Sequence, residues 1–297
     1  MIAEFLYIFV GCHGTPWRHI LRLQGVYFLL YLPCMLTYYL ISLAMIFVCV
    51  TTIFAIAIIK KDNSIIDIAY GIFFIITSTL LAWLVSLKGP LGPHIVVLLL
   101  FIYIWGIRLA TRIYLKNRER GEEDFRYKIW RTLWLAEGRT YFYVRSYLQI
   151  FLLQGLVVSV VLLPFTLTLE NTSPFITLSF FGMAIWIIGF LFESIGDAQL
   201  DTFIKRKRYL KEKIMKTGLW RYTRHPNYFG ESMMWWGIAF VAFSASGNAI
   251  VFLSPMLITY LLLYVSGIPM VEQKWSGDLE WEMYKAKTSP FLPLPPK

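Results

Sequence analysis

One short stretch carries many of the residues whose chemistry could serve a reaction. It runs from Gly218 to Glu231 and reads Gly-Leu-Trp-Arg-Tyr-Thr-Arg-His-Pro-Asn-Tyr-Phe-Gly-Glu. Pro226 has a fixed φ and no N–H, which suits the first position of a helix. A helix that begins there places its free N–H groups and positive dipole end beside the cationic side chains of the stretch, Arg221, Arg224 and His225. This pattern predicts an anion-binding site at the start of a helix.

Asn227 and Glu231 lie four residues apart in the same stretch, so they share one face of the predicted helix. The sequence around them is apolar enough to enter a membrane, where a polar pair without a partner is costly. The pair is therefore a candidate for contact with a ligand. The alternative interpretation is a membrane-interface anchor, with aromatic side chains at headgroup depth and arginines on the cytoplasmic side.

The composition places this stretch in a membrane protein. Of the 297 residues, 58% are hydrophobic and 18% aromatic, which excludes an ordinary soluble domain. The three cysteines show no CxxC spacing, and the four histidines are scattered along the chain. We therefore expect neither a disulfide framework nor a metal site.

Seven apolar runs are long enough to cross about 30 Å of hydrocarbon. They fall at residues 36–59, 65–87, 94–115, 146–169, 174–195, 229–246 and 249–271. Residues 1–35 are predicted as a separate interfacial or irregular segment, because Pro33 breaks an apolar run there. Residues 36–297 are predicted as one all-α domain, a polytopic bundle of seven transmembrane helices.

The distribution of basic residues predicts the orientation of this bundle. Lysine and arginine gather in the loops 116–145 and 205–224 and in the C-terminal tail, all on one side. The positive-inside rule makes that side cytoplasmic, with the N-terminus outside and the C-terminus in the cytoplasm. The same rule accounts for most of the net charge of +10, so we expect no nucleic-acid partner.

Polar side chains also occur in two earlier spans, where lipid alone would not favour them. Asp67 begins the second span and Tyr70 lies one turn further on. Asp67 either caps the start of that helix or takes part in chemistry. The third span carries a stripe at positions i, i+3 and i+7, formed by Trp105, Arg108 and Arg112.

The fifth span ends in carboxylates spaced by four residues, Glu193, Asp197 and Asp201. Their spacing puts them on one helix face, which must turn into the bundle rather than to lipid. Together these polar clusters predict a cavity open to the cytosol and walled by apolar helices. Such a cavity suits a water-soluble cofactor that meets a lipid substrate.

The residue types indicate the chemical class of that cofactor. Arginine binds phosphate through paired hydrogen bonds, and carboxylates accept hydrogen bonds from ribose hydroxyls. No GxGxxG motif follows a strand and no Walker sequence is present, so the cofactor must bind between helices. The residues alone thus predict a membrane enzyme with an anionic, nucleotide-like cofactor.

A resemblance to a known family sharpens this prediction. The segments Arg224-His225-Pro226-Asn227-Tyr228-Phe229-Gly230-Glu231 and Gly196-Asp197-Ala198-Gln199-Leu200 resemble the membrane steroid 5-alpha-reductase family, most closely its bacterial branch called DUF1295. The resemblance extends over roughly residues 50–297 and includes Glu282-Met283-Tyr284 followed by Ser289-Pro290-Phe291-Leu292-Pro293. Isoprenylcysteine carboxyl methyltransferases and some sterol reductases share the Arg-His-Pro-x-Tyr part.

This resemblance implies a seven-helix bundle with NADPH as cofactor. It implies reduction of the C=C bond of an α,β-unsaturated ketone in a lipidic, 3-oxo-Δ4-steroid-like substrate that enters from the bilayer. Together with the patterns above, it gives a candidate cofactor-binding set: Arg108, Arg112, Glu193, Asp197, Arg221, Tyr222, Arg224, His225, Asn227, Tyr228, Glu231 and Tyr284. The candidate catalytic residues are Asp67, Tyr70, Trp105 and Glu231.

The proton donor to the ketone oxygen is where the chain departs from the family. Steroid-reducing members carry a tyrosine in the third span, at the position that Trp105 takes here. Tryptophan donates an N–H but does not relay a proton. We therefore expect a protonated Asp67 to donate to the carbonyl oxygen, because burial favours the protonated acid, with Tyr70 as the second candidate.

The resemblance also indicates where the protein is located, and it leaves alternative functions open. It predicts a bacterial inner-membrane protein in contact with membrane lipids, with the cofactor site facing the cytoplasm and a monomer as a plausible state. The main alternative is an S-adenosylmethionine-dependent methyltransferase acting on a lipid or isoprenylcysteine carboxyl group. That cofactor has a sulfonium cation and no phosphate, so the arginines favour NADPH. A transporter would place its polar groups nearer mid-membrane, at broken helices.

Overall fold

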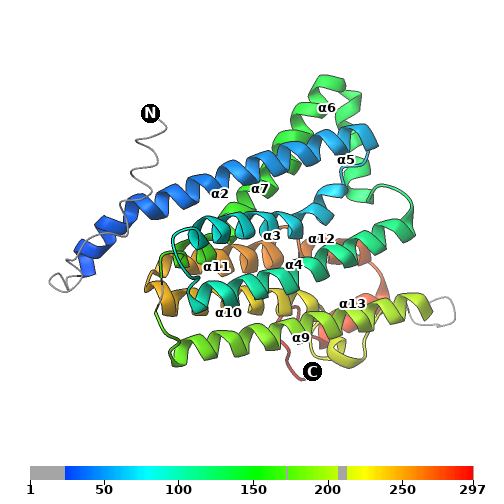
Figure 1. The fold of residues 1–297 in the computed structure, drawn as a ribbon. Helices are drawn as coiled ribbons and strands as arrows, with labels where there is room; N and C mark the ends of the chain where they lie inside the picture. Colours follow the sequence, from blue (N-terminus) through cyan, green and yellow to red (C-terminus); the bar gives the residue numbers. More distant parts are fainter. Residues whose placement is uncertain (1–23, 172, 207–212, 297) are drawn as a thin grey trace. The chain divides into compact units, whose positions relative to one another are not determined.

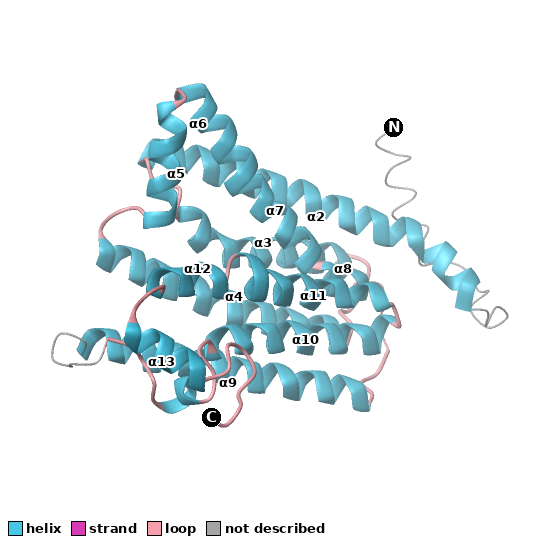
Figure 2. Ribbon diagram, turned by 180° about the vertical axis from the view of Figure 1, so that it is seen from behind, coloured by secondary structure: helices cyan, strands magenta, loops and turns pink. Residues whose placement is uncertain are grey.

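The computed structural model describes residues 24–171, 173–206 and 213–296. The long elements in these ranges are all helices (Figure 1; Figure 2). Strand-type pairing in the described ranges is limited to an isolated bridge between Thr223 and Ser289. The predicted all-α fold is therefore confirmed for the described part of the chain.

Six helical stretches within the described residues are long and apolar enough to cross a membrane. They are Met35–Lys60, Ile65–Ser86, Pro93–Arg120, Arg139–Thr168, Thr177–Arg206 and Ala249–Trp275. These helices make the chain an integral membrane protein, as predicted. The remaining predicted span, 229–246, forms the helix α10 (Pro226–Ser246), which is not among the six.

The predicted N-terminal segment 1–35 lies largely outside the described residues. Its last part is helical, because α2 (Gln24–Lys60) runs without interruption through Pro33. The expectation that Pro33 breaks the apolar run is therefore wrong for the backbone. A proline costs a membrane helix one backbone hydrogen bond, and neighbouring groups can satisfy the carbonyl that it leaves.

The chain divides into two compact units. Unit 1 consists of Met1–Leu91 and Gly106–Ser159, and unit 2 consists of Gly92–Trp105 and Val160–Lys297. Helix α4 (Pro93–Arg120) contributes its first half to unit 2 and its second half to unit 1.

In unit 1, α2 packs along α3 (Ile65–Ser86), and α3 meets the second half of α4. A Cβ on Gly71 would lie 2.7 Å from the carbonyl oxygen of Gly106. The two helices therefore touch backbone to backbone, a close approach that small residues allow between membrane helices. The predicted basic loop 116–145 is largely helical and leads into the next span: α5 (Phe125–Ala136), α6 (Arg139–Arg145), the π-helix η3 (Ser146–Leu152) and α7 (Leu153–Val161).

In unit 2, the central contact is between α9 (Thr177–Arg206) and α10. Glycines again allow it, since a Cβ on Gly189 would lie 2.6 Å from the carbonyl oxygen of Gly230. The first half of α4 packs on α9 through the rings of Phe101 and Trp186, stacked with centroids 4.0 Å apart. The remaining elements are α8 (Leu163–Thr168), η5 (Gly218–Arg221), η6 (Ala249–Phe252), α11 (Leu253–Tyr260), η7 (Leu261–Val265), α12 (Ile268–Glu272), η8 (Gln273–Trp275) and α13 (Leu279–Lys287).

Candidate functional site

The contact between α9 and α10 holds the first polar cluster of unit 2. Glu193 and Asp197 of α9 are each 4% exposed. Between them on the same helix lies Gly196, where a Cβ would approach the ring of Pro226 to 3.0 Å and the backbone nitrogen of Asn227 to 3.4 Å. The first turn of α10 therefore rests on the α9 segment that carries the two carboxylates.

Asn227 is the polar residue that α10 contributes at this contact. Its side-chain oxygen Oδ1 is buried and has no hydrogen-bond partner in the described part of the chain. Glu231, one turn further along α10, is half-buried. The structure thus brings three of the predicted cofactor-binding residues, Glu193, Asp197 and Asn227, to one helix contact, with Glu231 on the turn that follows.

The segment before α10 is fixed to α9 by hydrogen bonds. The side-chain oxygen of Gln199 accepts a hydrogen bond from the backbone N–H of Leu219 at 2.9 Å, and the indole N–H of Trp220 donates to the carbonyl oxygen of Gly196 at 3.0 Å. Gly218 has φ +64°, and a Cβ there would lie 2.5 Å from the carboxamide of Gln199. Its backbone conformation therefore favours glycine, and a side chain there would displace the carboxamide of Gln199.

Arg224 and His225 are turned inwards and share one carboxylate. Arg224 Nε donates to Glu272 Oε1 at 2.8 Å, and His225 Nε2 lies 3.0 Å from the same oxygen. Arg224 also donates from Nη2 to Glu272 Oε2 and from Nη1 to the carbonyl oxygens of Lys285 and Thr288. Four hydrogen bonds thus engage a guanidinium that has five N–H donors. Burial lowers the pKa of His225, against the opposing effect of Glu272.

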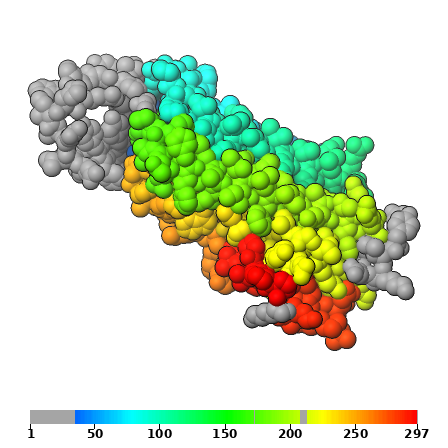
Figure 3. Space-filling model, turned by 90° about the horizontal axis from the view of Figure 1, so that it is seen from below, coloured from blue at the N-terminus to red at the C-terminus, as the bar shows by residue number. Residues whose placement is uncertain are grey.

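The C-terminal tail lies against the stretch that precedes α10, and Figure 3 shows its surface there in red beside yellow. Backbone hydrogen bonds join Arg224 N to Ser289 O at 2.9 Å and Leu294 N to Tyr222 O at 3.0 Å. The hydroxyl of Tyr284 donates to the carbonyl oxygen of Trp220. Burial raises the pKa of Tyr284 well above its ordinary value, so this phenol keeps its proton. In these contacts Tyr284 and Arg224 fix the tail, and their predicted cofactor roles stay predictions.

The other predicted residues of the stretch are more accessible. Arg221 is exposed, and Tyr222 is 43% exposed. The ring of Tyr228 stacks on that of His225, with centroids 5.3 Å apart. Arg221 is therefore an exposed cation close to the start of α10.

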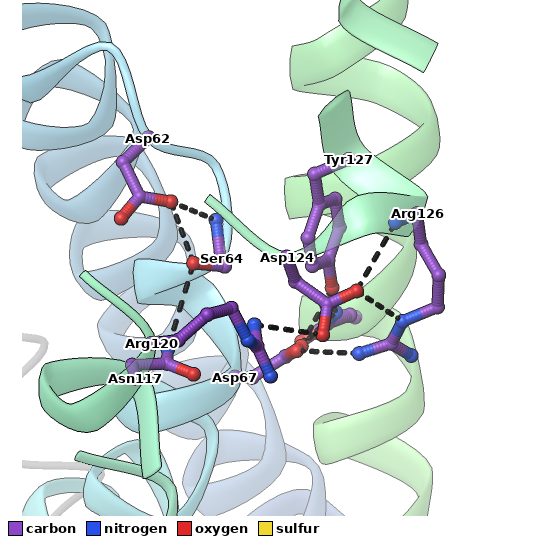
Figure 4. Close-up of polar contacts among 9 residues, drawn as sticks. Asp62, Ser64, Asp67, Asn117, Arg120, Asp124, Arg126 and Tyr127 are labelled. Atoms are coloured by element: carbon purple, nitrogen blue, oxygen red, sulfur yellow. Dashed lines mark hydrogen bonds and ion pairs between the residues drawn. The ribbon is translucent and has the colours of Figure 1, made fainter. Parts of the chain in front are cut away.

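Asp67 lies in a second polar cluster, within unit 1 (Figure 4). Its Oδ1 accepts a hydrogen bond from the hydroxyl of Tyr127 at 2.6 Å, and its Oδ2 accepts one from Arg126 Nη2 at 3.0 Å. Gln154 Nε2 lies 3.5 Å from Asp67 Oδ1 and 3.4 Å from the Tyr127 hydroxyl. Asp67 therefore does not cap α3, whose N-cap residue is Ser64.

The start of α5 positions the partners of Asp67. Asp124 is the N-cap residue of α5, and its Oδ1 accepts hydrogen bonds from the backbone and the side chain of Arg126. Its Oδ2 pairs with Arg120 at 3.0 Å. Burial alone would raise the pKa of Asp124, but Arg126 and Arg120 hold it below its usual range. The carboxylate thus stays charged and fixes Arg126 where it meets Asp67.

Tyr127 is a candidate functional residue that the sequence did not single out. Its side chain is buried, 3% exposed, and burial raises the pKa of its phenol well above the ordinary value. The phenol therefore carries a proton, directed at Asp67 at neutral pH. Because Tyr127 lies sixty positions after Asp67, in a segment expected to be a loop, no spacing pattern in the sequence links the two.

The predicted stripe on α4 is divided between the units. Trp105 belongs to unit 2, is 1% exposed and packs edge-to-face on Trp235 with ring centroids 5.1 Å apart. Arg108 and Arg112 belong to unit 1 and are half-buried. Tyr70 packs edge-to-face on Phe74.

The fold and these clusters define a helical membrane protein with buried charged groups at two places. Comparison with known proteins gives its family: the sequence matches DUF1295, described as a protein of unknown function, over residues 53–288. The match covers most of the chain, so the protein belongs to the DUF1295 family, as the resemblance predicted. No curated protein and no solved structure matches the chain.

Proposed function

We propose that the protein is an NADPH-dependent reductase that saturates the C=C bond of an α,β-unsaturated ketone in a lipidic, 3-oxo-Δ4-steroid-like substrate. The observation that carries the proposal is the buried Oδ1 of Asn227, which has no hydrogen-bond partner in the described part of the chain. A buried acceptor left without a donor costs about 1–3 kcal/mol. A nicotinamide carboxamide or a sugar hydroxyl is a donor of the kind that this oxygen lacks.

The residues around Asn227 also fit a nicotinamide dinucleotide. Glu193 and Asp197 provide buried carboxylates at the same helix contact, and carboxylates suit ribose hydroxyls. Arg221 is exposed close to the start of α10, where the first N–H groups of the helix favour an anion. These groups would hold the sugars and the phosphates, respectively. Membership of DUF1295 is compatible with this assignment.

The reaction also needs a donor at the ketone oxygen. Bound NADPH supplies the hydride that the β-carbon accepts. Negative charge then grows on the carbonyl oxygen, and a fixed donor there is worth about 3–4 kcal/mol. We assign this donor to the Asp67 cluster, with the Tyr127 hydroxyl as the group that carries the proton and Arg126 as the group that keeps Asp67 in place. The α-carbon takes a proton to complete the saturated ketone.

We propose that α10 is the seventh span, although it is less apolar than the six. Its polar side chains have partners inside unit 2: Ser232 lies 2.7 Å from the hydroxyl of Thr259, and Ser244 lies 2.7 Å from that of Ser179. A span tolerates polar groups that face other helices rather than lipid. With seven spans and the basic segments in the cytoplasm, the N-terminus lies outside, and the cofactor site faces the cytoplasm of a bacterial inner membrane.

One observation favours a second function, methyl transfer from S-adenosylmethionine to a lipid or isoprenylcysteine carboxyl group. Arg224 is engaged by Glu272 and two carbonyl oxygens, which leaves fewer cations for phosphates. Buried carboxylates such as Glu193 and Asp197 suit a sulfonium cation. Arg221 and the α10 N-terminus still favour a cofactor with phosphates.

Ligand binding to the purified protein separates the two functions. A ligand that binds the folded state raises the temperature of unfolding, so NADPH, NADH and S-adenosylmethionine are compared in thermal unfolding at several salt concentrations. We expect NADPH to stabilise the protein more than NADH, by an increment that falls as salt rises. Stabilisation by S-adenosylmethionine, with no stabilisation by NADPH or NADH, would support the methyltransferase function instead.

A further inference from the structure

Helix α5 turns Tyr127 and Arg131 towards the protein, whereas Lys128 and Thr132 are exposed. Tyr127 donates to Asp67, and Arg131 makes two hydrogen bonds to Glu123, at 2.7 and 2.8 Å. Glu123 in turn accepts a hydrogen bond from the backbone N–H of Asn63 at 2.7 Å, which ties the start of α5 to the start of α3. The inner face of the helix is therefore a polar one with its partners in place.

The exposed side of α5 carries an apolar stripe, with Lys128 and Thr132 beside it. Ile129 and Leu133 are four residues apart, so they lie one above the other on the helix surface, and they are 53% and 60% exposed. Phe125 and Ala136 extend the same stripe and are also exposed. A helix at a water-facing surface shows the reverse arrangement, with its apolar face inwards and its polar face outwards. Water is therefore an unfavourable medium for the outer face of α5.

The chain on either side of α5 indicates what the medium is. The helix begins five residues after the span Pro93–Arg120 and ends three residues before the span Arg139–Thr168. Short links thus join both ends of α5 to candidate spans, which keeps the helix close to the membrane. Trp130 and Trp134 are partly exposed and stack on each other with centroids 5.8 Å apart, and tryptophan is enriched at this depth of a membrane.

Exposed charges of both signs surround α5, with Glu119, Glu122 and Glu137 as the anions. Arg118 and Arg139, at the neighbouring ends of the two spans, are exposed cations. Cations at such a place suit the phosphate groups of anionic lipids. The apolar face, the tryptophans and the flanking arginines form the pattern of a helix that lies in the plane of the interface.

We propose that α5 is an in-plane membrane helix, with Ile129 and Leu133 inserted among lipid acyl chains and its inner face bound to the Asp67 cluster. The occupant of the exposed face is the leaflet in which the protein itself is embedded. Arg126 and Tyr127, which form hydrogen bonds with Asp67, both belong to α5. The position of α5 in the lipid therefore fixes where these two side chains lie. This proposal does not depend on the identity of the cofactor.

The test places a fluorescent label on the apolar stripe of α5 and on an exposed polar position of the same helix in full-length protein. Cys12, Cys34 and Cys49 are first replaced, and Leu133→Cys and Ile129→Cys are labelled with bimane after reconstitution in vesicles of phosphatidylethanolamine and phosphatidylglycerol. Lys128→Cys is the matched control, because Lys128 is an exposed polar residue of the same helix outside the apolar stripe. Emission is quenched either by doxyl-labelled lipid or by aqueous iodide.

We expect the labels at Leu133 and Ile129 to lose emission with doxyl lipid and to keep it in iodide, and the label at Lys128 to do the reverse. Two results would overturn the proposal. Iodide quenching at Leu133 without lipid quenching would show that the face meets water. Protection from both quenchers would show that protein, a second copy or another chain, covers the face instead of lipid.

Discussion

Arg224 and Asn227 are three residues apart in the sequence and have opposite surroundings in the structure. Arg224 is bound by Glu272 and by backbone carbonyl oxygens, whereas the amide oxygen of Asn227 is buried without a hydrogen-bond partner in the described residues. A phosphate at the start of α10 is therefore expected to meet Arg221 and the first N–H groups of the helix. A ligand that donates a hydrogen bond to Asn227 would remove the cost of this buried acceptor.

Replacement of Asn227 tests its role as a cofactor ligand. Asn227→Leu removes the amide, and the loss of one buried hydrogen bond should weaken NADPH binding about 10-fold or more. The fluorescence of bound NADPH measures this affinity. Asn248→Ala is the matched control, because Asn248 only caps the short helix η6, and it should bind NADPH as the wild type does. Equal affinity in both variants would remove Asn227 from the site.

Replacement of Tyr127 and replacement of Tyr70 distinguish between two candidates for the proton donor. Tyr127→Phe keeps the ring but removes the hydroxyl that donates to Asp67, so single-turnover oxidation of NADPH with an enone should slow by ~10²-fold. Tyr70→Phe removes the hydroxyl of the other candidate and should slow the step less, since the donor to Asp67 is Tyr127. The opposite ranking would return the donor role to Tyr70. A full loss in Asp67→Asn with none in Tyr127→Phe would return it to Asp67.

At the scale of elements, Glu272 of α12 joins the start of α10 to the C-terminal tail. Its side chain and that of Arg224 are 13% and 6% exposed, so the pair is largely shielded from water. A buried cation that loses its partner destabilises a protein strongly, by about 3–5 kcal/mol. The tail is therefore expected to depend on this carboxylate for its position.

Glu272→Ala should lower the free energy of unfolding by about 3 kcal/mol, because it leaves Arg224 buried without its carboxylate. Glu282→Ala is the control, since Glu282 is exposed on α13, and its effect should stay within about 0.5 kcal/mol. Chemical denaturation in detergent measures both. Similar stability of the two variants would show that the tail is held by its backbone contacts alone.

The sequence predicts the helices of this protein better than it predicts the contacts between their polar side chains. The apolar runs locate six spans because a membrane requires long apolar helices. The polar contacts escape such patterns: Arg126 and Tyr127 meet Asp67 from about sixty positions away, and Glu272 meets Arg224 across forty-eight. Helix α5 lies in the segment 116–145, which the sequence predicts as a basic loop because lysine and arginine gather there.

At the scale of the whole molecule, the topology depends on whether α10 crosses the membrane. In a variant without its three native cysteines, Thr217→Cys lies before α10 and Ala249→Cys after it, both at exposed positions. A membrane-impermeant maleimide should label Thr217→Cys only from the cytoplasmic side and Ala249→Cys only from the outside. Labelling of both from one side would mean that α10 does not span the bilayer.

Transfer of deuterium from labelled NADPH tests the central claim most directly. The purified protein, reconstituted in lipid, is mixed with NADPH carrying deuterium at the transferable position and with a 3-oxo-Δ4-steroid as probe. We predict that each NADPH oxidised places one deuterium on the β-carbon of a saturated ketone, with the second hydrogen coming from solvent, as mass spectrometry of the product can show. Two results together would contradict the account. The enone would be recovered intact and unlabelled, and the same preparation would transfer a methyl group from S-adenosylmethionine to a lipid carboxylate.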